Sequence, residues 1–205
     1  PVHLNVPFRE PLVPSSPVKL RARARRLPPS RQKPEPKPEQ LADLIGTVSG
    51  RRGLVVCGWG AEEEGFAGTL VQLADRLRCP VLADPLSNVR FGGHSRQTVI
   101  SRYDAFLRDD AFAARCQPEW VLRFGAMPVS KPLARYLENC AATDFVLVNS
   151  AGLRLDPGRR ATALLACDTV PLCAALKAAN PEPAPADWLA GFLEAEQRAS
   201  KVADT

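Results

Sequence analysis

The sequence GLVVCG at residues 53–58 is a short, continuous apolar run, the pattern of a strand that is buried on both faces of a parallel sheet. Comparable runs recur along the chain, and each is separated from the next by a segment with apolar residues at helical spacing. Such alternation predicts βαβ crossovers, a mostly parallel sheet and helices on both of its faces. The sequence therefore predicts a doubly wound α/β domain over residues 39–180.

The apolar pattern also places the individual elements. A first helix aligns Leu41, Leu44 and Val48 on one face and ends at Gly50. The strands expected after residues 53–58 are 80–83, 119–124, 144–148 and 162–166, and the helices expected between and after them are 62–78, 102–115, 131–139 and 169–179.

The segments on either side of this domain have a different character. Residues 1–12 begin with a strand-like alternation and are interpreted as the end of a preceding domain. Residues 13–38 are rich in proline and arginine, which is typical of an extended linker. Residues 181–205 are expected to form a second linker and an amphipathic helix that leads to a following domain and has little of its own domain to pack on.

The positive charge of the chain is concentrated in one segment. The chain has 27 basic and 22 acidic residues, but residues 14–40 alone carry +6, so the remainder is close to neutral. That segment has no aromatic side chain on which a base could stack, and a solvated linker is favoured over nucleic-acid binding. No run of about 20 apolar residues and no basic-then-apolar leader is present, so neither a membrane span nor a secretory signal is expected, and the expected compartment is the cytoplasm.

Six cysteines raise the question of disulfides and metal. No Cys-x-x-Cys pair occurs, and the two histidines, His3 and His94, lie far apart in the sequence. Most of the cysteines stand beside apolar residues, where a thiol behaves as a small buried hydrophobe. Buried, reduced cysteines and no metal site are therefore expected.

Ligands of an open parallel sheet gather at the carboxyl ends of the strands, near the point where the strand order reverses. Four predicted loops lie there: residues 58–62, 84–95, 125–130 and 149–160. The first begins Gly-Trp-Gly-Ala, but Glu63 stands where the dinucleotide motif needs glycine, and three glutamates would repel a pyrophosphate, so a structural turn is favoured. The second contains Arg90, whose planar fork suits a carboxylate but is more often a structural or solvated contact.

The third loop carries the strongest signal. Ser130 and Lys131 stand where a helix begins, and a lysine at the positive end of a helix creates an anion site. A simple helix cap followed by a surface lysine explains the same residues equally well. No Ser/His/Asp set, carboxylate pair or phosphate-binding loop is present, so the residues indicate an anion-binding α/β domain without catalytic residues of its own.

Several motifs resemble a known family. They are PVHLNVPFREPL at residues 1–12, ADPLSNVR at 83–90, the pair Tyr103-Asp104, and RFGAMPVSKPL at 123–133. This set is similar to the middle domain of the 2-succinyl-5-enolpyruvyl-6-hydroxy-3-cyclohexene-1-carboxylate (SEPHCHC) synthases, the MenD family of thiamine-diphosphate enzymes. The resemblance implies a Rossmann-like middle domain, between a first domain that holds a cofactor glutamate and a third that holds a Gly-Asp motif for Mg2+.

The resemblance also implies an activity. These transferases decarboxylate 2-oxoglutarate and add the succinyl unit to isochorismate in menaquinone or phylloquinone biosynthesis, with thiamine diphosphate supplying the carbanion chemistry. The intact enzymes are homo-oligomers. This chain would supply packing and cationic contacts, without thiamine diphosphate, Mg2+ or catalytic residues of its own, and would be inactive when isolated.

One family residue carries over to this sequence. A lysine that faces the acidic substrates corresponds to Lys131, although Pro132 follows it where some members have a basic residue. An alternative role is feedback sensing of the pathway product 1,4-dihydroxy-2-naphthoate, at Lys131 or at the weaker candidates Arg90, Arg102 and Arg123. A third possibility is a scaffold domain that binds neither.

Overall fold

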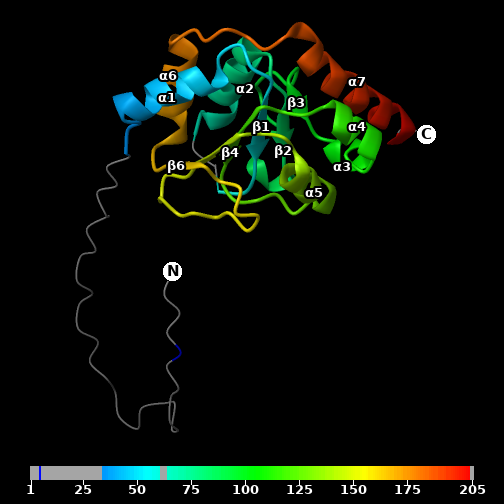
Figure 1. Cartoon of the computed structure of the whole chain (residues 1–205), viewed down its shortest axis with the longest axis horizontal. Coiled ribbons are helices and arrows are strands. Elements are labelled where there is room, and N and C mark those ends of the chain that lie inside the picture. Colours follow the sequence, from blue (N-terminus) through cyan, green and yellow to red (C-terminus); the bar gives the residue numbers. More distant parts are fainter. Residues whose placement is uncertain (1–4, 6–33, 61–63, 204–205) are drawn as a thin grey trace, which may run out of the picture. The chain divides into compact units, whose positions relative to one another are not determined.

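The computed structural model describes residue 5 and residues 34–60 and 64–203, and within residues 34–203 it contains a six-stranded, all-parallel sheet (Figure 1). The strand order is β3-β2-β1-β4-β5-β6. The elements are α1 (Pro38–Val48), β1 (Gly53–Cys57), α2 (Phe66–Leu77), β2 (Val81–Ala83), a 3₁₀ turn (Pro85–Ser87), β3 (Val99–Ile100), α3 (Tyr103–Phe106), α4 (Asp110–Arg115), β4 (Trp120–Phe124), α5 (Lys131–Asn139), β5 (Asp144–Val148), β6 (Ala163–Leu165), α6 (Thr169–Ala178) and α7 (Ala186–Ala203).

The centre of the sheet is the pair β1 and β4, and every residue of both strands is buried. Their register places Gly53 opposite Trp120. Glycine is required at this position because a Cβ atom on Gly53 would lie only 1.7 Å from the Trp120 ring. Because Gly53 has no side chain, the Trp120 ring can occupy that space while β1 and β4 pair.

Two hydrophobic layers cover the two faces of the sheet. Side chains from β1 alternate between them, since Val55 and Cys57 enter one layer while Leu54 and Val56 enter the other. The first layer is completed by α1, α2 and α6, and the second by α3, α4, α5 and α7 (Figure 1). This arrangement confirms the predicted doubly wound α/β fold.

The structure differs from the predicted elements in three details. The expected helix over residues 102–115 is two short helices: α3 ends at Phe106, and a new helix begins after Asp109, whose carboxylate caps α4 by accepting a hydrogen bond from the Ala111 N–H at 2.9 Å. Strand β3 has only two residues and was not predicted, since so short a strand has no periodicity to detect. The helix expected from residue 62 begins at Phe66, and residues 61–63 lie outside the described ranges.

Helix α7 corrects the expectation that residues 186–199 have little of their own domain to pack on. Trp188 and Phe192 are buried in the second hydrophobic layer, and the indole N–H of Trp188 donates to the Gly53 carbonyl at 2.7 Å. That this helix also leads to a following domain remains a prediction. The segments 1–12 and 13–38 lie outside the described residues, except for Asn5 and residues 34–38. Among the helices of the described ranges, none is long and apolar enough to cross a membrane.

All six cysteines are buried and free, which confirms the predicted burial. Burial raises the pKa of the thiols of Cys57, Cys79 and Cys173, and it raises the pKa of Cys167 to about 11. A thiol that is kept protonated and away from solvent is a poor nucleophile and a poor metal ligand. The cysteines therefore act as core residues.

Candidate functional site

The candidate site lies at the carboxyl edge of the sheet, where the strand order reverses. From β1 the chain proceeds outward through β2 to β3, and from β4 it proceeds outward through β5 to β6 on the other side. The connections after β1 and β4 therefore meet at the position where ligands bind in many open α/β sheets.

Main chain fills the crevice between these two connections. The Ala126 N–H donates to the Trp59 carbonyl at 2.8 Å, and the Gly58 N–H donates to the Phe124 carbonyl at 2.9 Å. A Cβ atom on Gly58 would lie 1.8 Å from the Ala126 carbonyl oxygen, and Gly125 has a φ of +72°. This close contact leaves no room between residues 58–60 and 125–126 for a pyrophosphate.

Asp84 joins two of the predicted loops. It follows β2, is only 2% exposed, and its carboxylate accepts hydrogen bonds from the Leu86 N–H at 2.9 Å and from the Val129 N–H at 3.3 Å. The first contact shapes the turn that begins the 84–95 loop. The second holds the loop that precedes α5.

Asp104, in α3, holds the next residue of that loop. The Ser130 hydroxyl donates to Asp104 Oδ1 at 2.6 Å and accepts from the Leu133 N–H at 3.2 Å, so Ser130 is also the N-cap of α5. Arg108 pairs with the same carboxylate at 2.7 Å. The hydrogen bond from Ser130, followed by the contact with Arg108, lowers the pKa of Asp104, and this carboxylate is ionised at neutral pH.

Lys131 is the first residue of α5 and is exposed. It forms no ion pair with any residue of the described ranges. The helix dipole places further positive charge at the same end of α5. Lys131 therefore offers an ammonium group to solvent beside the reversal point of the sheet, as an anion site requires.

The other predicted cations have internal partners. Arg90 donates from Nε to the Ala83 carbonyl at 2.6 Å, and its guanidinium lies 5.6 Å from the centre of the Tyr103 ring. Arg102 pairs with Glu196 of α7 at 3.6 Å, so its guanidinium is directed to α7. The structure thus brings Arg90, Ser130 and Lys131 to connected segments, and Arg102 is engaged elsewhere.

Arg123 lies within β4 and is 2% exposed. It donates to Met127 Sδ at 3.1 Å and to the Leu155 carbonyl, while its Nε has no partner. Burial lowers the pKa of this guanidinium, and Asp156 partly opposes that effect, although no carboxylate of the described part forms an ion pair with it. Arg123 is thus a buried cation that links the loop before α5 to the β5–β6 connection.

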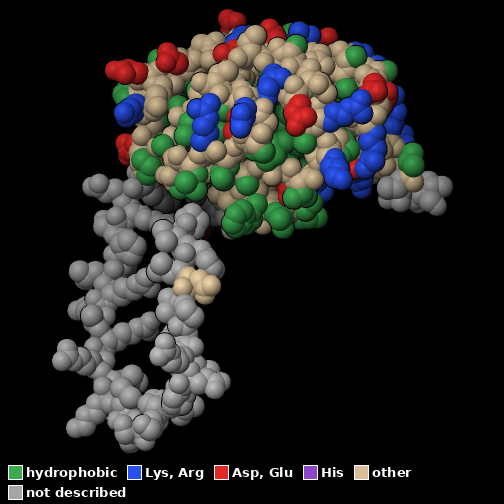
Figure 2. Space-filling model, turned by 60° about the horizontal axis from the view of Figure 1, so that its bottom comes forward, with side chains coloured by type: hydrophobic (Ala, Val, Ile, Leu, Met, Phe, Trp, Pro, Cys, Tyr) green, Lys and Arg blue, Asp and Glu red, His purple; other side chains and the backbone are tan. Residues whose placement is uncertain are grey.

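The carboxyl edge also carries an apolar rim. We use this name for the exposed hydrophobic residues of the connections after β1, β2, β4 and β5, which are Trp59, Leu86, Phe91, Val129, Leu153 and Leu155. Hydrophobic side chains gather on the lower part of the domain in Figure 2. Exposed apolar area of this kind commonly marks an interaction surface.

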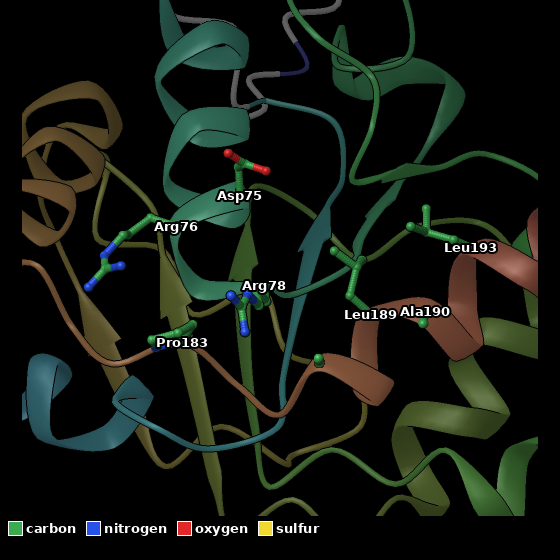
Figure 3. Close-up of a pocket in the computed structure, with 8 residues that line it drawn as sticks. Asp75, Arg76, Arg78, Pro183, Leu189, Ala190 and Leu193 are labelled. Atoms are coloured by element: carbon green, nitrogen blue, oxygen red, sulfur yellow. The ribbon is translucent and has the colours of Figure 1, made fainter.

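A separate pocket of about 560 Å³ lies between α2 and α7. The residues that line it include Arg76, Arg78, Leu189 and Leu193. Figure 3 shows the Arg76 side chain turned away from the two leucines. Because α2 runs back against the strands, its final residues lie at the amino edge of the sheet. This pocket is therefore remote from Lys131.

No group of three metal-binding side chains is found within residues 34–60 and 64–203. The residues that sequence reasoning missed are the two carboxylates, Asp84 and Asp104. Both belong to motifs that carry the family resemblance, but a role for them required the partners that only the fold supplies. A signal was available for Asp84, since Asp-Pro-Leu-Ser is typical of a side-chain-capped turn.

Comparisons with known proteins identify the family of this domain. A family model described as "Middle domain of thiamine pyrophosphate" matches residues 26–205. The SEPHCHC synthase of Dechloromonas aromatica (strain RCB) is 38% identical over 199 residues, which are 97% of this chain and 37% of that protein. The SEPHCHC synthase of Chloroflexus aurantiacus is 41% identical over 215 residues, 98% of this chain and 35% of that protein. The chain thus spans about a third of the length of these curated relatives.

A solved structure from Mycobacterium smegmatis, described as a thiamin diphosphate-dependent enzyme, matches with a TM-score of 0.52. Its sequence identity is 17%, and the match covers 82% of this chain and 31% of that one. At this identity the likeness supports the fold alone.

Proposed function

The chain belongs to the middle-domain family of thiamine pyrophosphate enzymes, and from that premise we propose that it is the central domain of a SEPHCHC synthase. The support is the identity of 38–41% to synthases of that name over almost the whole chain. The proposed reaction is decarboxylation of 2-oxoglutarate and addition of the succinyl unit to isochorismate, on the route to menaquinone or phylloquinone. The expected compartment is the cytoplasm.

Thiamine diphosphate, when bound, supplies the carbanion chemistry of such an enzyme. The described residues of this chain do not fit the cofactor, because no metal-binding cluster is formed and main chain fills the crevice at the reversal point. The cofactor and Mg2+ are therefore assigned to flanking domains of the same polypeptide, within a homo-oligomer. The apolar rim provides a surface against which those domains can pack.

The role assigned to this chain is to hold acidic substrate through Lys131. Both substrates carry carboxylates, and an ammonium group beside a helix N-terminus attracts them. The observation that carries this assignment is that Lys131 is exposed and has no internal counterion in the described part, whereas Arg102 has one. Arg90 is a second, weaker contact, and Ser130 orients the start of the helix.

The test is Lys131→Ala in the full-length enzyme. Loss of one charge-assisted hydrogen bond, worth ~1.5–3 kcal/mol, should raise the KM for 2-oxoglutarate or isochorismate about 10- to 100-fold. Lys131→Arg should retain most of the affinity. Lys177→Ala is the matched control, because Lys177 is exposed, donates to Gln72 and lies at the far end of α6. An unchanged KM in Lys131→Ala would exclude the assigned role.

The second candidate function is sensing of 1,4-dihydroxy-2-naphthoate, and the observation that favours it is Arg123. Arg123 is a buried guanidinium with an unpartnered Nε, and no carboxylate of residues 34–60 and 64–203 pairs with it, so it could receive an aromatic carboxylate if the loop from Gly152 to Asp156 moved aside. Saturation of such a site at 100 times Kd should stabilise the protein by about 2.7 kcal/mol. Thermal unfolding with the naphthoate, in wild type and in Arg123→Lys and Lys131→Ala, measures this. No shift in wild type and no KM effect of Lys131→Ala would leave only the scaffold role.

A further inference from the structure

The loop that precedes α5 is held by carboxylates from two other connections of the sheet. Asp84, which follows β2, accepts from the Val129 N–H, and Asp104, in α3 after β3, accepts from the Ser130 hydroxyl. Val129 and Ser130 are consecutive, and Lys131 comes directly after them. Asp84 and Asp104 thus hold Val129 and Ser130, and these two residues determine the position of the Lys131 backbone.

We infer that Asp84 and Asp104 are positioning residues for substrate binding, acting through the loop that places Lys131. This inference rests on the proposed function of Lys131. The two anchors differ in character: Asp84 is almost fully buried, and the Asp104 side chain is about half exposed, at 47%. A substrate site tolerates little displacement, and a shift of about 1 Å can cost about 100-fold in rate.

The charge balance around Asp104 is consistent with this role. An unpaired carboxylate so near Lys131 would weaken the attraction of the ammonium group for an anion. Arg108 pairs with Asp104 at 2.7 Å and compensates its charge. Asp104 can therefore hold Ser130 without cancelling the positive electrostatic potential around the Lys131 ammonium group.

The two anchors also connect the halves of the sheet. Both carboxylates come from the side that contains β2 and β3, whereas the loop they hold follows β4, on the other side of the reversal point. The main-chain contact between Trp59 and Ala126 fixes the beginning of the same loop. The loop is thus anchored at its start and at its end, and the end is the part that bears on Lys131.

The test is a double-mutant cycle in the full-length enzyme with Asp104→Ala and Lys131→Ala. Asp104→Ala alone should raise the KM for the acidic substrate about tenfold, because one of the two anchors of the helix start is lost. Asp104→Asn should recover part of the loss, since its amide oxygen still accepts from Ser130. In the Lys131→Ala background, Asp104→Ala should have little further effect, because the group that it positions is gone.

The control is Asp110→Ala, an exposed carboxylate of α4 that pairs with Arg135 and does not touch the loop. It should leave the KM unchanged. Asp84→Asn is the companion variant, and if it fails to fold, the cycle at Asp104 still decides the question.

The outcomes separate the two ideas. Equal effects of Asp104→Ala with and without Lys131 would overturn the positioning role and indicate general structural damage. A normal KM in Asp104→Ala together with a raised KM in Lys131→Ala would also overturn it and leave the proposed function intact. A normal KM in Lys131→Ala would overturn the proposed function and, with it, this inference.

Discussion

At the amino edge of the sheet, ion pairs join the residues before β1 to those at the beginning of β4 and β5, whereas at the carboxyl edge the connections are joined by main-chain hydrogen bonds and by the carboxylates of Asp84 and Asp104. Arg51 pairs with Asp144 at 3.0 Å, and Arg52 pairs with Glu119 at 3.4 Å. At the other edge, residues 58–60 and 125–126 meet through backbone hydrogen bonds, and Lys131 has no described counterion. Arg51 and Arg52 are thus neutralised by carboxylates at the amino edge, whereas Lys131 at the carboxyl edge is available to an external anion.

This difference shows how to separate structural from functional charge in such a domain. A cation that serves the fold has an internal partner. For Arg51 and Arg102 this partner is a carboxylate, and for Arg90 and Arg123 it is a main-chain carbonyl. The apolar rim lies at the same edge of the sheet as Lys131. Both features fit a surface that is completed by other parts of a larger enzyme.

The largest effect is expected where main chain closes the carboxyl edge. Gly58→Ala should lower the free energy of unfolding by about 3 kcal/mol, because its Cβ would lie 1.8 Å from the Ala126 carbonyl oxygen. Urea denaturation of this chain measures the change. Gly46→Ala is the control: Gly46 lies within α1 with nothing near its Cβ position, and alanine there should raise stability by up to ~1 kcal/mol. Similar values for both variants would show that the close contact is unimportant.

A smaller effect is expected at the amino edge. Glu119→Ala should lower the free energy of unfolding by about 0.5–1 kcal/mol, because the pairs with Arg51 and Arg52 are partly exposed and screened by solvent. Lys131→Ala should leave stability within about 0.5 kcal/mol of wild type, because it removes no ion pair to a residue that the structure describes. Denaturation at low and high salt measures both. A larger loss in Lys131→Ala than in Glu119→Ala would contradict the proposed contrast between the edges.

The smallest effect concerns pH. The backbone N–H of Arg52, with further contributions from the Arg52 and Arg51 side chains, lowers the pKa of Glu119. A carboxyl with a lowered folded pKa contributes stability above its unfolded pKa of about 4.3, and this contribution is lost as the pH falls through the folded value. Stability measured from pH 6 to pH 3 should therefore fall less steeply in Glu119→Gln than in wild type. Parallel curves would show that Glu119 is not held by its partners.

The sequence by itself determined the fold class and most of the sheet. Continuous apolar runs such as residues 53–58 and 144–148 are typical of strands that are covered on both faces of a parallel sheet. Ser130 indicated the start of α5, because its side chain can cap the helix locally. These features are set by neighbouring residues. They can therefore be inferred without the fold.

Only the tertiary structure decided which charged groups are available. Arg102 and Arg123 were weaker candidates than Lys131 in the sequence, and the structure shows why they are not available: Arg102 pairs with Glu196 of α7, and Arg123 is buried in β4. Asp84 and Asp104 acquired a role only when β2, β3 and β4 placed them beside Val129 and Ser130. Hydrogen bonds and ion pairs between residues 26 to 94 positions apart depend on how the chain is wound, and local sequence carries no information about those distances.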